Sequence, residues 1–114
     1  MPNPVVHFEI IGKDGGKLRD FYSKAFGWQM QVAPGMDYGL VDTGGQGING
    51  GVGQGEQTSV TFYIEVDDPQ AYLNKIESMG GKTVVPVTVI PNMVTFAQFT
   101  DPEGNVVGLV KAES

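Results

Sequence analysis

One order of elements, a strand, a helix and three further strands, occurs twice in this 114-residue chain, and no other feature of the sequence constrains its fold as strongly. Alternating and β-branched residues predict the strands of the first copy at residues 4–11, 28–33, 37–42 and 48–53. The same patterns predict the strands of the second copy at residues 59–66, 82–90, 93–100 and 105–111. We therefore expect a single domain over residues 1–114, with a first module of about residues 3–54 and a second of about residues 57–112.

Each copy also contains one helix with recognisable ends. Asp14 is a good N-cap for the first helix, and Gly27 is a good C-terminal stop. An apolar stripe at helical spacing predicts the face that packs on a sheet, namely Leu18, Phe21, Tyr22, Ala25 and Phe26. The second helix has an acidic cap, Pro69 in its first turn, and Gly80 and Gly81 after it. Its predicted packing side contains Tyr72, Ile76 and Met79.

The repeat extends to individual residues. A shift of 57 positions lays Met36–Gly53 on Met93–Val110 without a gap, so that Gly51 meets Gly108. At the start of each copy "HFEI" lies on "YIEV", which gives the pairs His7 with Tyr63 and Glu9 with Glu65. The matching order of elements remains the stronger sign of a repeat, because a few identities over so short a stretch arise by chance.

The first strand of each copy has one polar face. His7 and Glu9 share a face in the first copy, and Tyr63 and Glu65 share a face in the second, since side chains alternate along a strand. The apolar faces are expected to lie under the helices. The predicted fold is therefore α+β, with two βαβββ modules that form a curved, mostly antiparallel sheet around one cavity lined by the polar faces.

Composition excludes several classes of function. The formal charge is -6, and the seven Lys and Arg residues are scattered, so no basic face for nucleic acid is expected. There is no cysteine, which excludes disulfides and Cys-based zinc sites and suits a reducing cytoplasm. No apolar run approaches the roughly 20 residues of a membrane span, and the N-terminus lacks the pattern of a signal peptide.

The segment "GQGING" at residues 45–50 matches the G-x-G-x-x-G pattern, but we do not interpret it as a dinucleotide site. That fingerprint needs a helix directly after the glycines, whose N-terminus meets the pyrophosphate. Here "GVGQGEQT" follows, and such a segment does not hold a helix. A flexible hairpin followed by the linker between the copies is the better interpretation, and no cofactor is predicted.

Several of these motifs resemble the vicinal oxygen chelate superfamily, the group of glyoxalases, bleomycin-resistance proteins and extradiol dioxygenases. The resemblance rests on "VVHFEI", "FYSKAFGW", "YIEVDD", "GGK" and "FTDPEGNVVGLV", which occur in register over nearly the whole chain. The likeness is greatest to a small bacterial, glyoxalase-like branch, most of whose members lack a defined activity. It implies paired βαβββ modules and, because members of the family commonly dimerise, a homodimer.

The resemblance also bears on metal binding. In metal-dependent members, one residue from the first strand and one from the last strand of each module hold a divalent ion. By position these residues are His7, Gly51, Tyr63 and Gly108, and the motif "DPxGNxxEL" of those members is "DPEGNVVGL" here. Glycine offers no ligand and neutral tyrosine is a poor one, whereas a divalent ion needs about three protein ligands. The inherited site is therefore predicted to hold no metal.

The predicted ligand-binding residues lie mainly on the polar faces: His7, Glu9, Trp28, Tyr63, Glu65, Phe96 and Gln98, with Tyr38 as a weaker candidate. His7, the only histidine, is the candidate general base, although a strand histidine bonded to a neighbour is the plainer interpretation. Glu9 and Glu65 form an acid/base pair only if they face one cavity; otherwise they are surface carboxylates. Trp28 is alternatively a core or interface residue.

These expectations favour a metal-free, cytoplasmic protein that binds a compact neutral or cationic small molecule, by analogy with drug-sequestering relatives. One alternative is a metal-dependent lyase, isomerase or dioxygenase that acts on vicinal oxygens. Another is a metal-free enzyme with His7 as general base. A third is an accessory module whose cavity has closed. The sequence does not decide whether a reaction is catalysed.

Overall fold

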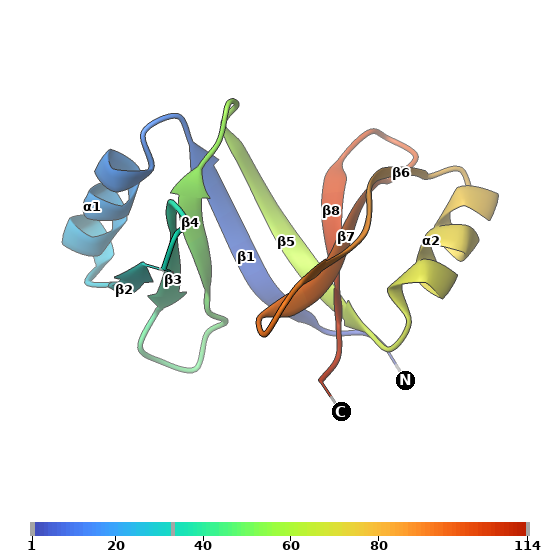
Figure 1. The fold of residues 1–114 in the computed structure, drawn as a ribbon, viewed down its shortest axis with the longest axis horizontal. Coiled ribbons are helices and arrows are strands. Elements are labelled where there is room, and N and C mark those ends of the chain that lie inside the picture. Colours follow the sequence, from blue (N-terminus) through green and yellow to red (C-terminus); the bar gives the residue numbers. More distant parts are fainter. Residues whose placement is uncertain (1, 33, 114) are drawn as a thin grey trace. The chain divides into compact units, whose positions relative to one another are not determined.

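The computed structural model describes residues 2–32 and 34–113 and contains the predicted βαβββ order twice (Figure 1). The first copy consists of β1 (Val5–Gly12), α1 (Gly15–Phe26), β2 (Gln29–Val32), β3 (Tyr38–Asp42) and β4 (Gly50–Gln54). The second consists of β5 (Ser59–Val66), α2 (Pro69–Ser78), β6 (Lys82–Ile90), β7 (Val94–Thr100) and β8 (Val106–Lys111). The predicted α+β class and the paired modules are confirmed.

Contacts divide the chain into two compact units, Val6–Thr61 and Phe62–Ser114, the second of which includes Met1–Val5. In the first unit the strand order is β2-β3-β4-β1, and in the second it is β5-β8-β7-β6. The opening and closing strands of each copy, β1 with β4 and β5 with β8, pair in parallel. The other neighbours pair antiparallel, so each sheet is mostly antiparallel, as predicted.

The helix ends are formed as the sequence predicts. The Asp14 carboxylate accepts a hydrogen bond from the Lys17 backbone N–H at 3.1 Å, and Gly27 has a φ of 72° and donates its N–H to the Ser23 carbonyl. In α2, Asp68 caps the Ala71 N–H at 3.2 Å. A left-handed residue after the last turn costs glycine little, which explains why α1 stops there.

The predicted apolar stripe of α1 is only partly buried. Leu18 and Tyr22 are half-buried, whereas Phe21 and Phe26 are 60% and 63% exposed. Ala25 is also exposed. The prediction that all five pack on the sheet is therefore wrong, because helical spacing shows which side chains share a face but not which of them contact the sheet. Tyr22 stacks on Trp28, with ring centroids 5.3 Å apart.

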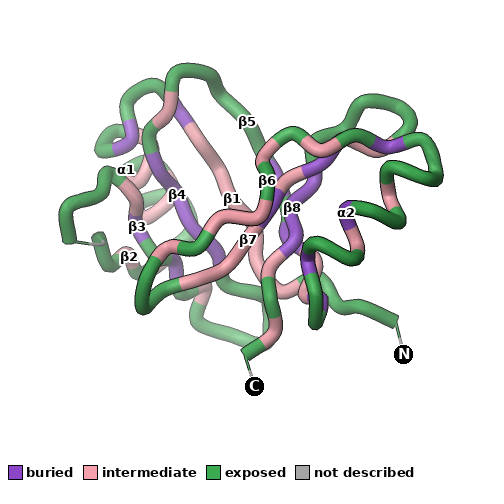
Figure 2. The backbone as a smooth tube through the Cα atoms, turned by 45° about the vertical axis from the view of Figure 1, so that its right-hand side comes forward, coloured by how far each residue is buried: buried purple, intermediate pink, exposed green. Residues whose placement is uncertain are grey.

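In α2 the half-buried Tyr72 and Ile76 pack against the core of the second unit, as predicted, but Met79 is 67% exposed because it is the C-cap of the helix. Leu73, which the predicted face omitted, is 2% exposed. It belongs to one buried cluster with Val66, Ala97, Phe99, Val107 and Leu109. Buried positions, purple in Figure 2, follow β8 in this unit and β4 in the other.

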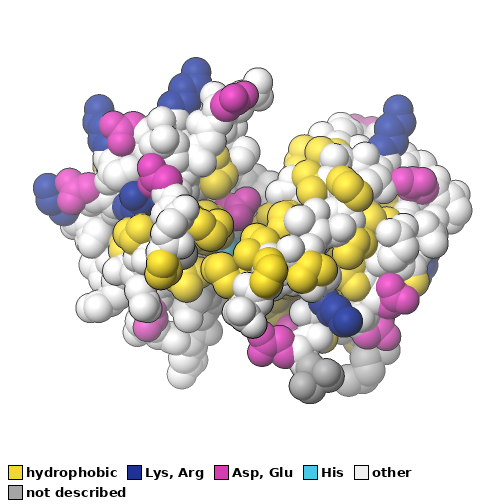
Figure 3. All heavy atoms as spheres, in the orientation of Figure 1, with side chains coloured by type: hydrophobic (Ala, Val, Ile, Leu, Met, Phe, Trp, Pro, Cys, Tyr) yellow, Lys and Arg dark blue, Asp and Glu magenta, His cyan; other side chains and the backbone are white. Residues whose placement is uncertain are grey.

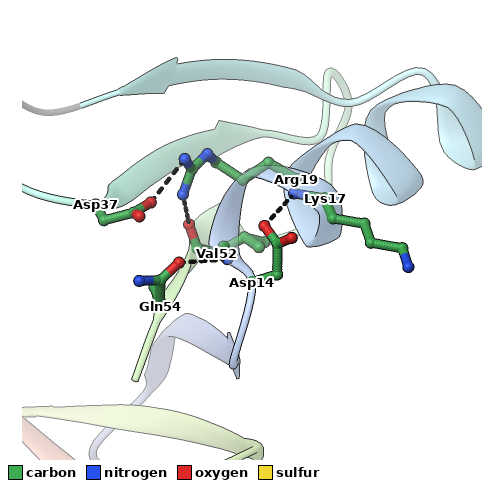
Figure 4. Close-up of polar contacts among 7 residues, drawn as sticks. Asp14, Lys17, Arg19, Asp37, Val52 and Gln54 are labelled. Carbon is green, nitrogen blue, oxygen red and sulfur yellow. Dashed lines mark hydrogen bonds and ion pairs between the residues drawn. The ribbon is translucent and has the colours of Figure 1, made fainter. Parts of the chain in front are cut away.

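Arg19 fastens α1 to the strands of the first unit (Figure 4). Its guanidinium forms an ion pair with Asp37 at 2.7 Å and donates to the Val52 carbonyl at 3.4 Å. Its stem occupies the space beside Gly39, where an added Cβ would overlap it. Nearby, the Gly15 N–H donates to the Gln54 side chain at 3.0 Å. These contacts fix β3 and β4 relative to the helix.

The gapless repeat of 57 positions is wrong for one strand. Gly51 pairs with Leu40, whereas its counterpart Gly108 pairs with Gln98, so β3 and β7 correspond with an offset of 58 positions. The gapless shift lays Leu40 on Ala97, which is a core residue on the helix-covered face. The hairpins of the two copies thus differ in length by one residue, and a one-residue slip moves a strand's side chains to the opposite face.

In the part of the chain that the structure describes, no helix is both long and apolar enough to cross a membrane.

Replacing Leu73 by alanine is expected to lower the free energy of unfolding by about 2–5 kcal/mol, since it removes buried methyl groups and leaves a cavity. The measurement is urea denaturation followed by circular dichroism. Met79→Ala on the same helix is the control, with an expected change below about 0.5 kcal/mol because that side chain is exposed. Equal losses in both variants would contradict the assigned core.

Candidate functional site

The face of the first sheet that α1 does not cover is largely polar. It carries His7 and Glu9 from β1, Tyr38 and Leu40 from β3, and the bare backbone of Gly51 from β4, which the strand registers bring together. The other face carries Val41 and Val52, which are buried.

One phenol connects the two polar residues of β1. The Tyr38 hydroxyl lies 3.0 Å from His7 Nε2 and donates to Glu9 Oε2 at 3.1 Å. All three side chains are half-buried. His7 and Glu9 thus share one face of β1, as predicted. Both also contact the Tyr38 hydroxyl, which is 31 residues from His7 and 29 residues from Glu9 along the chain.

A hollow of about 580 Å³ opens beside this group. Its lining includes His7, Gln29, Met30, Gln31, Leu40, Val41, Asp42, Asn49 and Gly50. The polar lining consists of one imidazole, three amides and one carboxylate, and neither lysine nor arginine is among these residues. Such a lining can donate and accept hydrogen bonds, and its only formal charge at neutral pH is negative.

Burial lowers the pKa of His7 below its ordinary value of 6.5, because desolvation disfavours the imidazolium. His7 is therefore neutral near pH 7 and has one protonated and one basic ring nitrogen. In that form it can accept a proton or a hydrogen bond at the wall of the hollow.

The corresponding face of the second sheet carries Tyr63, Gln98 and Phe96. The Gln98 amide donates to the Tyr63 hydroxyl at 2.8 Å. The Tyr63 and Phe96 rings meet edge to face, with centroids 6.4 Å apart. Glu65 lies two residues further along β5 and is half-buried. The structure thus brings the predicted residues of this copy onto one face of their sheet.

Trp28 lies apart from the polar group. Its ring contacts Tyr22, Phe26 and Phe8, with centroids 5.3, 5.7 and 5.3 Å away. This aromatic cluster belongs to the helix side of the first unit. Its position favours the alternative of a core residue over a place in the wall of the hollow.

The positions that hold metal in related proteins do not suit a divalent ion here. A Cβ added to Gly51 would overlap the Tyr38 ring, and one added to Gly108 would overlap the Tyr63 ring. By register Gly51 stands opposite Glu9, and Gly108 stands opposite Tyr63. Within residues 2–32 and 34–113, no three His, Cys, Asp or Glu side chains are grouped to hold an ion. The side chains at these positions therefore do not provide the ligands that a divalent ion needs.

Sequence reasoning gave Tyr38 too small a role and missed the polar lining contributed by Gln29, Gln31, Asp42 and Asn49. A usable signal was present in two of the strands. Gln29 and Gln31 alternate in β2, and Tyr38, Leu40 and Asp42 alternate in β3, so each set shares one face. The pairing of Gln29 with Asp42 and of Gln31 with Leu40 aligns the two sets.

The resemblance seen in the motifs is confirmed by comparison with known families. The model of the Glyoxalase/Bleomycin resistance protein/Dioxygenase superfamily matches residues 5–109. The chain belongs to this superfamily, whose members share the paired βαβββ modules described above.

Three relatives illustrate the range of similarity. A mycobacterial protein named as a glyoxylase, CFP32, from Mycobacterium bovis and Mycobacterium tuberculosis, is 28% identical over 87% of this chain, which spans only 42% of the relative's length. A glyoxylase-like domain-containing protein of Didymella fabae is 30% identical over 85% of this chain and 84% of its own. Methylmalonyl-CoA epimerase from M. tuberculosis has a similar fold, with a TM-score of 0.69 over 96% of this chain and 88% of its own, at 13% identity.

The lowered pKa of His7 predicts how stability depends on pH. The pKa of His7 is 6.5 in the unfolded chain and lower in the folded chain. At pH values between these two, the unfolded chain binds a proton that the folded chain does not. The stabilising contribution of neutral His7 is therefore complete above pH 6.5 and is lost as the pH falls toward the pKa of the folded chain. Thermal unfolding of the wild type and of His7→Gln at several pH values measures the difference. A difference that does not change below pH 6.5 would contradict the assignment.

Gly108→Ala is expected to destabilise the fold by about 1–3 kcal/mol, because the new methyl group meets the Tyr63 ring. Urea denaturation measures the change. Gly45→Ala is the matched control, since nothing lies within 4 Å of its added Cβ. If Gly108→Ala is as stable as the control, the tyrosine does not occupy the space over this glycine.

Proposed function

We propose that this chain is a small-molecule-binding protein of the glyoxalase-like kind that works without a metal ion. The observation that carries the proposal is the hollow beside His7 in the first unit, whose lining includes His7, Asp42 and three amides. Its volume of about 580 Å³ is within the range of about 300–1,000 Å³ that is typical of small-molecule sites. The two glycines at the inherited metal positions support the absence of an ion.

The charge of the site supports a neutral or cationic ligand. The hollow has Asp42 in its lining and neither lysine nor arginine, and the chain carries a formal charge of -6. On the face shown in Figure 3, the Lys and Arg side chains are scattered and do not form a patch. A CoA ester carries several phosphate charges, so the substrate class implied by the name of the epimerase neighbour is disfavoured for this chain.

Three further properties belong to the same proposal. The protein is a cytoplasmic homodimer, as the family resemblance and the absence of cysteine favour. It has no nucleic-acid partner, which the scattered cations support. The ligand also contacts Glu9. For the second module, the binding role predicted for Tyr63, Glu65, Phe96 and Gln98 stays a proposal about the uncovered face of that module's own sheet.

A metal-free enzyme is the second candidate, and one observation favours it. His7 is kept neutral by burial at the wall of the hollow, and a neutral imidazole is a competent general base near pH 7. A turnover lost in His7→Gln but kept in Gln70→Ala, which removes an exposed amide from α2, would support this candidate. A metal-dependent lyase, isomerase or dioxygenase is disfavoured by the donor set.

The binding proposal is tested with a panel of neutral carbonyl compounds, organic amines and CoA thioesters, by thermal shift with and without EDTA. We expect stabilisation by a neutral or cationic compound that EDTA does not change. Gln29→Ala is expected to weaken that compound's affinity about fivefold, the effect of one lost hydrogen bond. Gln70→Ala removes an exposed amide from α2 and should leave the affinity unchanged. Stabilisation that requires a divalent ion, or that only CoA thioesters produce, would refute the proposal.

A further inference from the structure

Tyr38 reaches β1 by crossing the strand between them. In the order β3-β4-β1 its strand is roughly 9–10 Å from β1, two strand spacings away. Its ring lies over β4 at Gly51 and Gly53, where an added Cβ would overlap the ring or lie 2.6 Å from Cδ1. Two glycines in the register of β3 and β4 thus open a path that any other residue would block.

The hydrogen bonds along this path have a defined direction. A phenol has one proton to donate, and Tyr38 gives it to the Glu9 carboxylate, which when ionised only accepts. The contact between the Tyr38 oxygen and His7 Nε2 then needs its proton from the imidazole. Protons therefore point in sequence from His7 through Tyr38 to Glu9.

From this geometry we propose that Tyr38 is a positioning residue that holds His7 in the Nε2–H tautomer, with Glu9 setting the direction of the phenol. Nδ1 is then the basic nitrogen of a ring whose orientation is fixed. The inference rests on the proposed binding function. The fixed tautomer gives the hollow an imidazole whose donor and acceptor nitrogens are defined, in place of a metal ligand. A carboxylate that orients a histidine through a hydrogen bond serves the same purpose in other proteins.

The second module offers an internal comparison. Tyr63 also covers a glycine, Gly108, but its hydroxyl accepts from the Gln98 amide and no histidine is present there. The phenol over a glycine therefore occurs in both copies, whereas the link to an imidazole belongs to the first. Tyr63→Phe is accordingly a matched control for Tyr38→Phe, since each removes one hydroxyl and keeps the ring in place.

The test is ¹⁵N NMR of the imidazole in the ligand-free protein at pH 8, where His7 is neutral. His7 is the only histidine, so its signals need no separate assignment. We expect the wild type and Tyr63→Phe to show the proton on Nε2 alone. In Tyr38→Phe the signals of the two ring nitrogens should shift away from the wild-type values, because the acceptor of the Nε2 proton has been removed.

A wild-type proton on Nδ1, averaged nitrogen shifts in the wild type, or a Tyr38→Phe spectrum identical to the wild type would overturn the inference. Because no ligand is added, this outcome is separate from the ligand screen. A fixed tautomer with no binder in the screen would leave the inference standing and count against the binding function. A compound that binds in the screen, together with an imidazole proton that is not fixed on Nε2, would support the binding function and overturn the inference.

Discussion

The parallel pairing of the first and last strands in each copy is the constraint on which the rest of the molecule depends. β1 with β4 and β5 with β8 bring residues more than 40 positions apart into register, and this pairing closes each βαβββ unit. Parallel neighbours need a crossover connection, and the helix and the two intervening strands supply it. The helix then covers one face, which leaves the other face to the side chains of the opening strand.

Glycine in the closing strand determines what that uncovered face can do. At Gly51 and Gly108 the backbone is bare, and a tyrosine ring from a neighbouring strand lies over each. A phenol thus occupies the place where the family resemblance puts a carboxylate ligand. The phenol is neutral and both donates and accepts hydrogen bonds, whereas a carboxylate would be charged and would only accept. A face built this way is suited to hydrogen bonding with an organic molecule and unsuited to holding an ion.

Local signals in the sequence were enough to predict the order of the elements, the caps at Asp14 and Gly27, and the alternation that puts His7 and Glu9 on one face. Each of these depends on residues within a few positions of one another. The exposure of Phe21 and Phe26 could not be predicted, because it depends on contacts with strands that are distant in the sequence, which helical spacing does not show.

The same limit applies to the site itself. The bond between Tyr38 and His7 joins residues 31 positions apart across a third strand, and only the register of that strand reveals it. The polar lining from β2 and β3 depends on the same register. The family resemblance indicated that Gly51 and Gly108 replace metal ligands. It did not indicate that the rings of Tyr38 and Tyr63 cover them.

The one-residue difference between the two hairpins means that the halves of this molecule are not interchangeable parts. A chimera that grafted Met36–Gly53 onto Met93–Val110 by simple alignment would put the carboxylate of Asp42 where Phe99 stands in the core. The same graft would move the apolar side chain of Val41 to the uncovered face. Each half therefore has its own hydrogen-bonding register, and an exchange of segments at equal positions would preserve neither.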